Sequence, residues 1–446
     1  MTTISKAALA ALLLAGTSAL AAAPASAKDK QDKQEQPQIK LSDEFRKAAA
    51  PAQTALAAGD LATAETNITA AQAAAKTDDE KYIADELRLQ LLAKQNANVG
   101  TDAAAMARAD AAYKAPLDSL LSNPKTPADQ RGKLASARGQ IAFNEKNYAD
   151  AVKYYTMAQQ AGFSSPDMTL ALATAKIKSG DTPGGIAALD QVVKADEAKG
   201  QKAPEDFYKY AISNLYKTND RAATLDWVKR WLTAYPTAKN WRSAIVVFGF
   251  QGPTAARLAK VDKLDLYRLM DVTGALADRG DFIEYAQYAN DLGLPDEAKT
   301  VIAKGKAAGK IPASDSDAAS IAKSAAAGIS SEGSLSALAT KAASSPKGDL
   351  AQQTADAYLG QGNYAKAIEL YKLALQKGVS NADAANMHLG IAEAMSGDKA
   401  SAQTHFAAVA NEPAKDVAGL WLAYVSGGAP TGAAPAAPAA PATPQG

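Results

Sequence analysis

Two histidines are the imidazole groups that this 446-residue chain offers for catalysis or metal binding. They are His388 and His405, and because the chain has no cysteine, thiol nucleophiles, thiolate metal sites and disulfides are excluded together. Catalytic zinc usually takes three protein ligands, and the sequence places no third ligand beside this pair. A structural role for both histidines is therefore favoured over a two-histidine metal site, and we expect no metal and no cofactor.

Runs of carboxylates are the other candidates for acid and base chemistry. Asp78, Asp79 and Glu80 form one run, and Asp296 and Glu297 form another. Both runs stand where an amphipathic helix begins, and there they stabilise the partial positive charge of a helix N-terminus. The sequence holds no Gly-x-Ser-x-Gly elbow, phosphate-binding loop or HExxH motif. We predict no catalytic residue, no enzymatic activity and no small-molecule substrate, with a carboxylate-based enzyme as an alternative.

Charge and composition narrow the class of protein. Lysine and arginine number 48 against 47 acidic residues, and a net charge of +1 favours neither a nucleic-acid binder nor a membrane-surface protein. Hydrophobic residues make up 47 %, but much of this is alanine and only 6 % of residues are aromatic. Since alanine is the best helix former and adds little volume, this composition predicts closely packed helices.

One pattern recurs along the chain and predicts the elements that position these side chains. Gly362 and Asn363 end one helix and cap the next, and Ala367, Tyr371 and Ala374 then recur on one helix face. Similar turns, each followed by a stripe of packing residues, begin at Gly59, Lys146, Gly180, Asn219 and Gly397. Positions 146 and 180 lie 34 residues apart, and positions 362 and 397 lie 35 apart.

This spacing, with its small, aromatic and turn residues, resembles the tetratricopeptide repeat, a helical pair of ~34 residues. The resemblance covers most of the chain and implies an all-α fold, an α-solenoid of tetratricopeptide-like helix-turn-helix pairs with an irregular middle section. Residues 240–251 are the one apolar, β-branched and aromatic run, for which we favour a buried helix over a strand because a lone strand would have no sheet to join.

The N-terminus has the layout of a secretory signal peptide. Lys6 precedes an apolar run, and small residues at Ala25 and Ala27 indicate cleavage after Ala27. A retained membrane anchor is the alternative, but the run is short for a membrane span. We expect a periplasmic protein, or alternatively a secreted one, with no stable membrane insertion once the signal is removed.

Composition shifts predict six segments. Residues 1–27 are the signal peptide and 28–41 a polar spacer, for which an interaction arm is the alternative. Residues 42–304 form the N-terminal and central repeat body, and residues 305–347 form low-complexity alanine and serine helices or a hinge. Residues 348–426 form a C-terminal repeat-like pair, and 427–446 a disordered proline and alanine tail.

The resemblance also implies where a partner would bind. In the family, the first helix of each pair lines a groove that accepts a peptide or protein segment. Carried onto three successive pairs, the groove positions are Lys133, Ser136, Gln140, Phe143 and Asn144, then Leu170, Thr174, Ile177 and Lys178, and then Lys209, Ser213, Tyr216 and Lys217.

Lysine at four of these positions predicts a preference for an acidic or carboxylate-bearing segment, against the alternative of a solvated lysine face. The sequence therefore predicts a non-enzymatic periplasmic scaffold that binds a protein or peptide in the cell envelope. An accessory protein of envelope polysaccharide or outer-membrane export machinery is an alternative. That alternative requires exposed rings at Tyr216, Trp227, Trp231 and Trp241.

Overall fold

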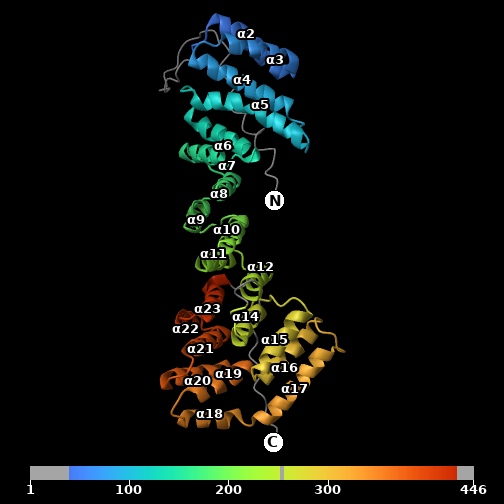
Figure 1. Ribbon diagram of the computed structural model, residues 1–446, viewed down its shortest axis with the longest axis vertical. Coiled ribbons are helices and arrows are strands. Elements are labelled where there is room, and N and C mark those ends of the chain that lie inside the picture. The colour runs from blue at the N-terminus through green and yellow to red at the C-terminus, as the bar shows by residue number, and fades with distance from the viewer. Residues whose placement is uncertain (1–39, 252–255, 429–446) are drawn as a thin grey trace, which may run out of the picture. The chain divides into compact units, whose positions relative to one another are not determined.

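The computed structural model describes residues 40–251 and 256–428 of the chain (Figure 1). Within these ranges the regular elements are all helices, most of which pack against the next helix in the sequence, so the described chain is an all-α solenoid of consecutive helical pairs. The predicted signal peptide and nearly all of the predicted polar spacer and C-terminal tail lie outside the described residues.

The chain divides into two compact units, Met1–Phe207 and Tyr208–Gly446, which we describe separately. The segment boundaries expected from composition stay a prediction. The described helices of unit 1 are α2 (Asp43–Ala58), α3 (Leu61–Ala74), α4 (Asp78–Gln95), α5 (Ala103–Ser122), α6 (Ala128–Asn144), α7 (Tyr148–Gln160), α8 (Pro166–Lys178) and α9 (Thr182–Glu197). Helix α10 (Glu205–Lys217) contains the boundary between the units.

The recurring turns have one backbone design. At Lys146 the backbone is left-handed, with φ of 60°, and at Gly180 φ is 97°. The next residue, Asn147 or Asp181, is the N-cap of the following helix, and its side chain accepts the backbone N–H three residues on. This combination satisfies orphan backbone groups at both helix ends. The same design occurs at Gly59, Asn219, Gly362 and Gly397.

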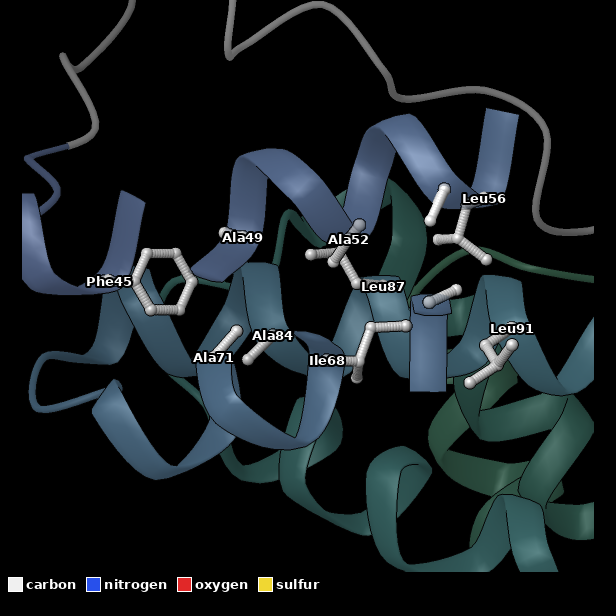
Figure 2. Packing of buried hydrophobic residues seen from close by; sticks show 11 residues of the cluster. Phe45, Ala49, Ala52, Leu56, Ile68, Ala71, Ala84, Leu87 and Leu91 are labelled. Atoms are coloured by element: carbon white, nitrogen blue, oxygen red, sulfur yellow. The ribbon is translucent and has the colours of Figure 1, made fainter. Parts of the chain in front are cut away.

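Small residues let paired helices approach closely, as the alanine-rich composition predicted. A Cβ atom built on Gly139 of α6 would lie 2.8 Å from the Tyr155 ring of α7, so only glycine fits at this crossing. Figure 2 shows the corresponding core of α2, α3 and α4, where Ala52 and Ala71 pack among Phe45 and Ile68. These contacts join neighbouring helices, which is the packing of a repeat array.

Unit 2 contains the irregular middle section and the last pairs. Its helices are α11 (Arg221–Ala234), α12 (Ala238–Ile245), α14 (Lys260–Val272), α15 (Arg279–Asp291), α16 (Pro295–Ala307), α17 (Ser316–Glu332), α18 (Leu335–Ser344), α19 (Asp349–Gly360), α20 (Tyr364–Lys377), α21 (Ala382–Ser396), α22 (Lys399–Ala407) and α23 (Ala414–Ala423), with π-helical turns η1 (Val246–Phe250) and η2 (Tyr424–Gly428). The apolar run 240–251 is thus helical, as favoured, ending in a π-helical turn.

The C-terminal helix α23 packs against helices from the beginning of unit 2, and we call this contact the closure of unit 2. Helix α23 packs against α22, its neighbour in sequence, but also against α11 and α14 (Figure 1, red beside green). A Cβ atom on Gly419 of α23 would lie 2.9 Å from Leu225 of α11, so the two helices approach closely. Trp421 is fully buried and stacks on Phe406, with ring centroids 5.7 Å apart. The sequence pattern did not predict this non-local contact.

Candidate functional site

The predicted groove positions of unit 1 lie on α6 and α8. On α6, Lys133 and Asn144 are exposed, whereas Ser136, Gln140 and Phe143 are half-buried. On the same helix the packing positions are buried, as at Leu134 and Ile141. The alternation arises because residues three and four apart share one helix face. The face assigned to a partner therefore differs from the packing face at Lys133 and Asn144, whereas Phe143 packs against the core and lies edge-on to Tyr148 of α7.

Two polar groove residues on α6 are already tied to neighbouring helices. Gln140 Nε2 donates to Asn144 Oδ1 at 2.8 Å, and Asn144 Nδ2 donates to Asp110 Oδ2 of α5 at 2.9 Å. The Tyr155 hydroxyl of α7 donates to Gln140 Oε1 at 3.1 Å. Burial raises the pKa of Asp110, and the hydrogen bond from Asn144 opposes that shift. These amides are held in fixed orientations, which suits them to a recognition surface.

The groove positions on α8 are more apolar. Leu170, Thr174 and Ile177 are half-buried and Lys178 is exposed. Ile177 also contributes to packing, because a Cβ atom on Gly185 of α9 would lie 2.5 Å from its side chain. Neither Lys178 nor Lys133 has a hydrogen bond or ion pair with another described residue. Both ammonium groups are thus available to an incoming carboxylate.

The remaining predicted positions lie on α10. Lys209, Ser213 and Lys217 are exposed, and Tyr216 is 37 % exposed. The Lys209 Nζ atom lies 5.6 Å from the centroid of the Trp231 ring of α11, which is a cation–π contact. Lys209 is therefore partly committed to its own unit.

The aromatic residues named for the export-accessory alternative lie mostly in the core. Trp227 and Trp231 of α11 are 4 % and 6 % exposed, and Trp241 of α12 is fully buried. A buried indole cannot stack on a sugar ring, so three of the four residues on which that alternative depended are unavailable. Tyr216 is the one of the four with an exposed ring.

The two histidines contact different carboxylates. His405 of α22 is half-exposed, and its Nδ1 lies 2.6 Å from Glu393 Oε2 of α21. His388 of α21 is 5 % exposed, and its Nδ1 lies 2.6 Å from Asp356 Oδ1 of α19. In the described part of the chain, no group of three or more histidine, aspartate or glutamate residues has the arrangement of a metal site.

The predicted carboxylate runs do stand in the first turns of α4 and α16, but each contains one residue with a further role. Glu80 accepts backbone N–H groups of Ser42 at 2.8 Å, Lys76 at 2.8 Å and Thr77 at 3.1 Å, and so ties α4 to the start of α2. These hydrogen bonds, the Ser42 bond foremost, lower the pKa of Glu80 to about 2.

Glu297 belongs to a buried ionic cluster in unit 2 that sequence reasoning missed. Arg268 of α14 donates to Glu297 through Nε at 2.8 Å and Nη2 at 2.6 Å, and to Asp265 Oδ1 at 2.9 Å. The Tyr285 hydroxyl of α15 donates to Glu297 at 2.9 Å. The available signal was a charged pair, Asp265 and Arg268, at helical spacing within the otherwise apolar run Leu264–Met270.

The cluster offers little space for a substrate. A hollow lined by Leu294, Pro295, Glu297, Ala357 and Gly360 has an empty volume of about 150 Å³. Ligand pockets are usually clefts of roughly 300–1,000 Å³.

No helix among the described residues is long and apolar enough to span a membrane.

The fold and the first-helix faces together define a helical-repeat protein of tetratricopeptide-like type. Comparisons with known proteins add little to this. No protein-family model matches the chain, and no curated protein matches it. Among solved structures, a chain of "Crystal structure of APC/C hetero-tetramer Cut9-Hcn1" is similar, with 14% sequence identity over 86% of this chain and 84% of that chain, and a TM-score of 0.19.

Proposed function

We propose that this chain is a non-enzymatic scaffold of the bacterial cell envelope that binds a protein or peptide partner along the first helices of unit 1. The observation that carries the proposal is the separation of faces on α6 and α8. Packing positions such as Leu134 and Ile141 are buried against neighbouring helices, whereas the groove positions are exposed or half-buried. In helical-repeat proteins such surfaces bind extended segments.

The chemistry of this surface favours an acidic extended segment. Lys133 and Lys178 are exposed cations without an intramolecular partner among the described residues. Half-buried Phe143, Leu170 and Ile177 supply apolar contact area. Charges at the rim of an interface mainly set the association rate and specificity, whereas apolar anchors provide most of the affinity.

The envelope location rests on the N-terminal sequence. A lysine, an apolar run and small residues at Ala25 and Ala27 form the three parts of a secretory signal. Mass spectrometry of the mature N-terminus tests this part separately, and a chain that retains residues 1–27 and stays in the cytoplasm would contradict it.

Charge reversal tests the binding surface. In the native envelope, crosslinked partner recovered with Lys133→Glu plus Lys178→Glu should fall severalfold, because the reversal repels an acidic segment. The matched control is Lys153→Glu plus Lys194→Glu, which makes the same charge change on the second helices α7 and α9. Equal recovery with both pairs would contradict a groove with this preference.

A further inference from the structure

His388 lies where helices from distant parts of unit 2 meet. Its Nδ1 lies 2.6 Å from Asp356 Oδ1 of α19, and its Nε2 lies 3.4 Å from Asp265 Oδ2 of α14. The Tyr371 hydroxyl of α20 donates to the same Asp356 oxygen at 2.5 Å. The imidazole is 5 % exposed. One buried ring therefore connects α21 to helices that begin more than 100 residues earlier and 33 residues earlier in the chain.

The charges around His388 are unbalanced if the ring is neutral. Arg268 shares its one positive charge between Asp265 and Glu297, and Asp356 is a third carboxylate nearby. Asp262 of α14 also faces His388 electrostatically. The group that faces it from α20 is the phenol of Tyr371, with ring centroids 6.1 Å apart. A second cation is needed to offset this excess of buried carboxylates.

Hydrogen-bonding capacity leads to the same conclusion. A neutral imidazole has one N–H donor and one acceptor nitrogen, whereas the imidazolium has two donors. Both nitrogens of His388 face carboxylate oxygens, which accept hydrogen bonds when ionised. A neutral ring would direct a nitrogen lone pair at one of these oxygens. The imidazolium donates a hydrogen bond to Asp356, and it places its second N–H 3.4 Å from Asp265 Oδ2 as an ion pair without hydrogen-bond geometry.

Asp265 also contacts the C-terminal helix α23. The Trp421 indole N–H of α23 donates to the backbone oxygen of Asp265 at 3.2 Å, and this bond is buried. Helix α23 thereby contacts α14 at the residue that faces His388. A shift of Asp265 would reach the closure of unit 2 through this bond.

We propose that His388, in its imidazolium form, is an ionic lock that holds the C-terminal closure of unit 2 and releases it when the ring loses its proton. Burial alone lowers the pKa of His388, but the charges of Asp265 and Asp356 outweigh burial and raise the pKa to about 10. Since the folded pKa exceeds the unfolded value of 6.5, the stabilisation is fully present below pH 6.5 and is lost as pH rises through 10.

Histidine NMR tests the charge state directly, because the chain contains two histidines in all. In the full chain labelled with ¹⁵N-histidine, His388 should show two protonated ring nitrogens at pH 8. A His405→Gln variant assigns the remaining resonance. A neutral His388 at pH 8, or one that titrates near 6.5, would overturn the lock.

Hydrogen exchange tests the structural consequence. In His388→Gln, amides of α14, α19, α21 and α23 should exchange roughly a hundredfold faster or more, which is the loss expected when one partner leaves a buried ion pair. Wild-type protein should show the same loss above pH 10, whereas His405→Gln should leave α14 and α19 protected. Unchanged protection in His388→Gln would overturn the proposal.

A milder variant covers the case in which His388→Gln does not fold. Asp356→Asn keeps the shape of the side chain and removes its charge. The pKa of His388 should then fall by roughly one unit or more, because an opposite charge at this distance is lost. An unchanged titration of His388 would show that Asp356 does not hold the proton, and would overturn the lock as well.

Discussion

Unit 1 and unit 2 use similar helical pairs but are held together differently. In unit 1 the main contacts join helices that are neighbours in sequence, such as α2 with α3 and α6 with α7. In unit 2 the last helix, α23, returns to α11, and Arg221 and Asp416, 195 residues apart, form an ion pair there. A repeat array accumulates stability from neighbour to neighbour, whereas a closed unit depends on contacts that form all together.

The buried polar groups of the two units differ in degree. In unit 1, Glu80 accepts the backbone N–H groups of Ser42, Lys76 and Thr77 near helix ends, and Arg138 of α6 pairs with Asp118 of α5, whose side chain is 44 % exposed. Those of unit 2 join side chains of separate helices, as between Arg268 and Glu297. Breaking a buried ion pair lowers the free energy of unfolding more than removing a helix cap does, because the remaining partner is a buried, uncompensated charge. The comparison therefore predicts a graded series of variants.

The largest effect should follow from removing the central cation of unit 2. Arg268→Met leaves Glu297 uncompensated and leaves Asp265 with His388 alone, and it should destabilise unit 2 by about 3–5 kcal/mol. Tryptophan fluorescence in urea measures this selectively, because Trp227, Trp231, Trp241 and Trp421 all lie in unit 2. The control Lys323→Met on the exposed face of α17 should change nothing. An unchanged midpoint for Arg268→Met would contradict the central role of the cluster.

A smaller loss of stability, equal in the two units, is expected at a packing feature that both units share. A Cβ atom on Gly139 would lie 2.8 Å from the Tyr155 ring in unit 1, and one on Gly390 would lie 2.8 Å from the Phe406 ring in unit 2. Each glycine→alanine variant should cost about 1–3 kcal/mol through overpacking. Hydrogen exchange resolves the two units, and Gly100→Ala, which points into open space, is the control. A loss at one site alone would show that the shared packing rule fails.

The smallest effect should follow from loosening a helix start in unit 1. Glu80→Gln weakens charge-assisted hydrogen bonds to three backbone N–H groups and should cost about 1–2 kcal/mol. Since the folded pKa of Glu80 is about 2, its stabilisation is present above pH 4.5 and is lost as pH falls toward 2. Hydrogen exchange of the α4 amides as a function of acid pH measures this loss. A Glu80→Gln variant with the wild-type acid profile would contradict the prediction.

Local features of the fold could be predicted because they depend on short-range chemistry. A left-handed residue followed by aspartate or asparagine specifies a turn, as at Gly180 and Asp181. Alanine or glycine opposite an aromatic ring specifies a helix crossing, as at Gly139 and Tyr155. Both signals lie within a few tens of residues, so the helical pairs could be read from the sequence.

The closure and the buried cluster could not be predicted because their partners are far apart in the chain. Nothing near Asp265 indicates Trp421 or His388, and His388 was interpreted as one of a pair with His405 rather than as a neighbour of Asp356. The groove residues on α6, α8 and α10 came from the repeat register, and their role in binding stays a prediction. Register predicts a face, whereas a partner's chemistry must be measured.

Site-directed photocrosslinking in the native envelope tests the central claim most directly. A photoreactive residue replaces Ser136 on α6 or Thr174 on α8, with exposed Gln159 on α7 and Gln191 on α9 as the controls. A scaffold that binds along its first helices should yield one reproducible crosslinked partner from positions 136 and 174, and none from 159 or 191. Crosslinking only from the second helices, or equally from all four positions, would contradict that account.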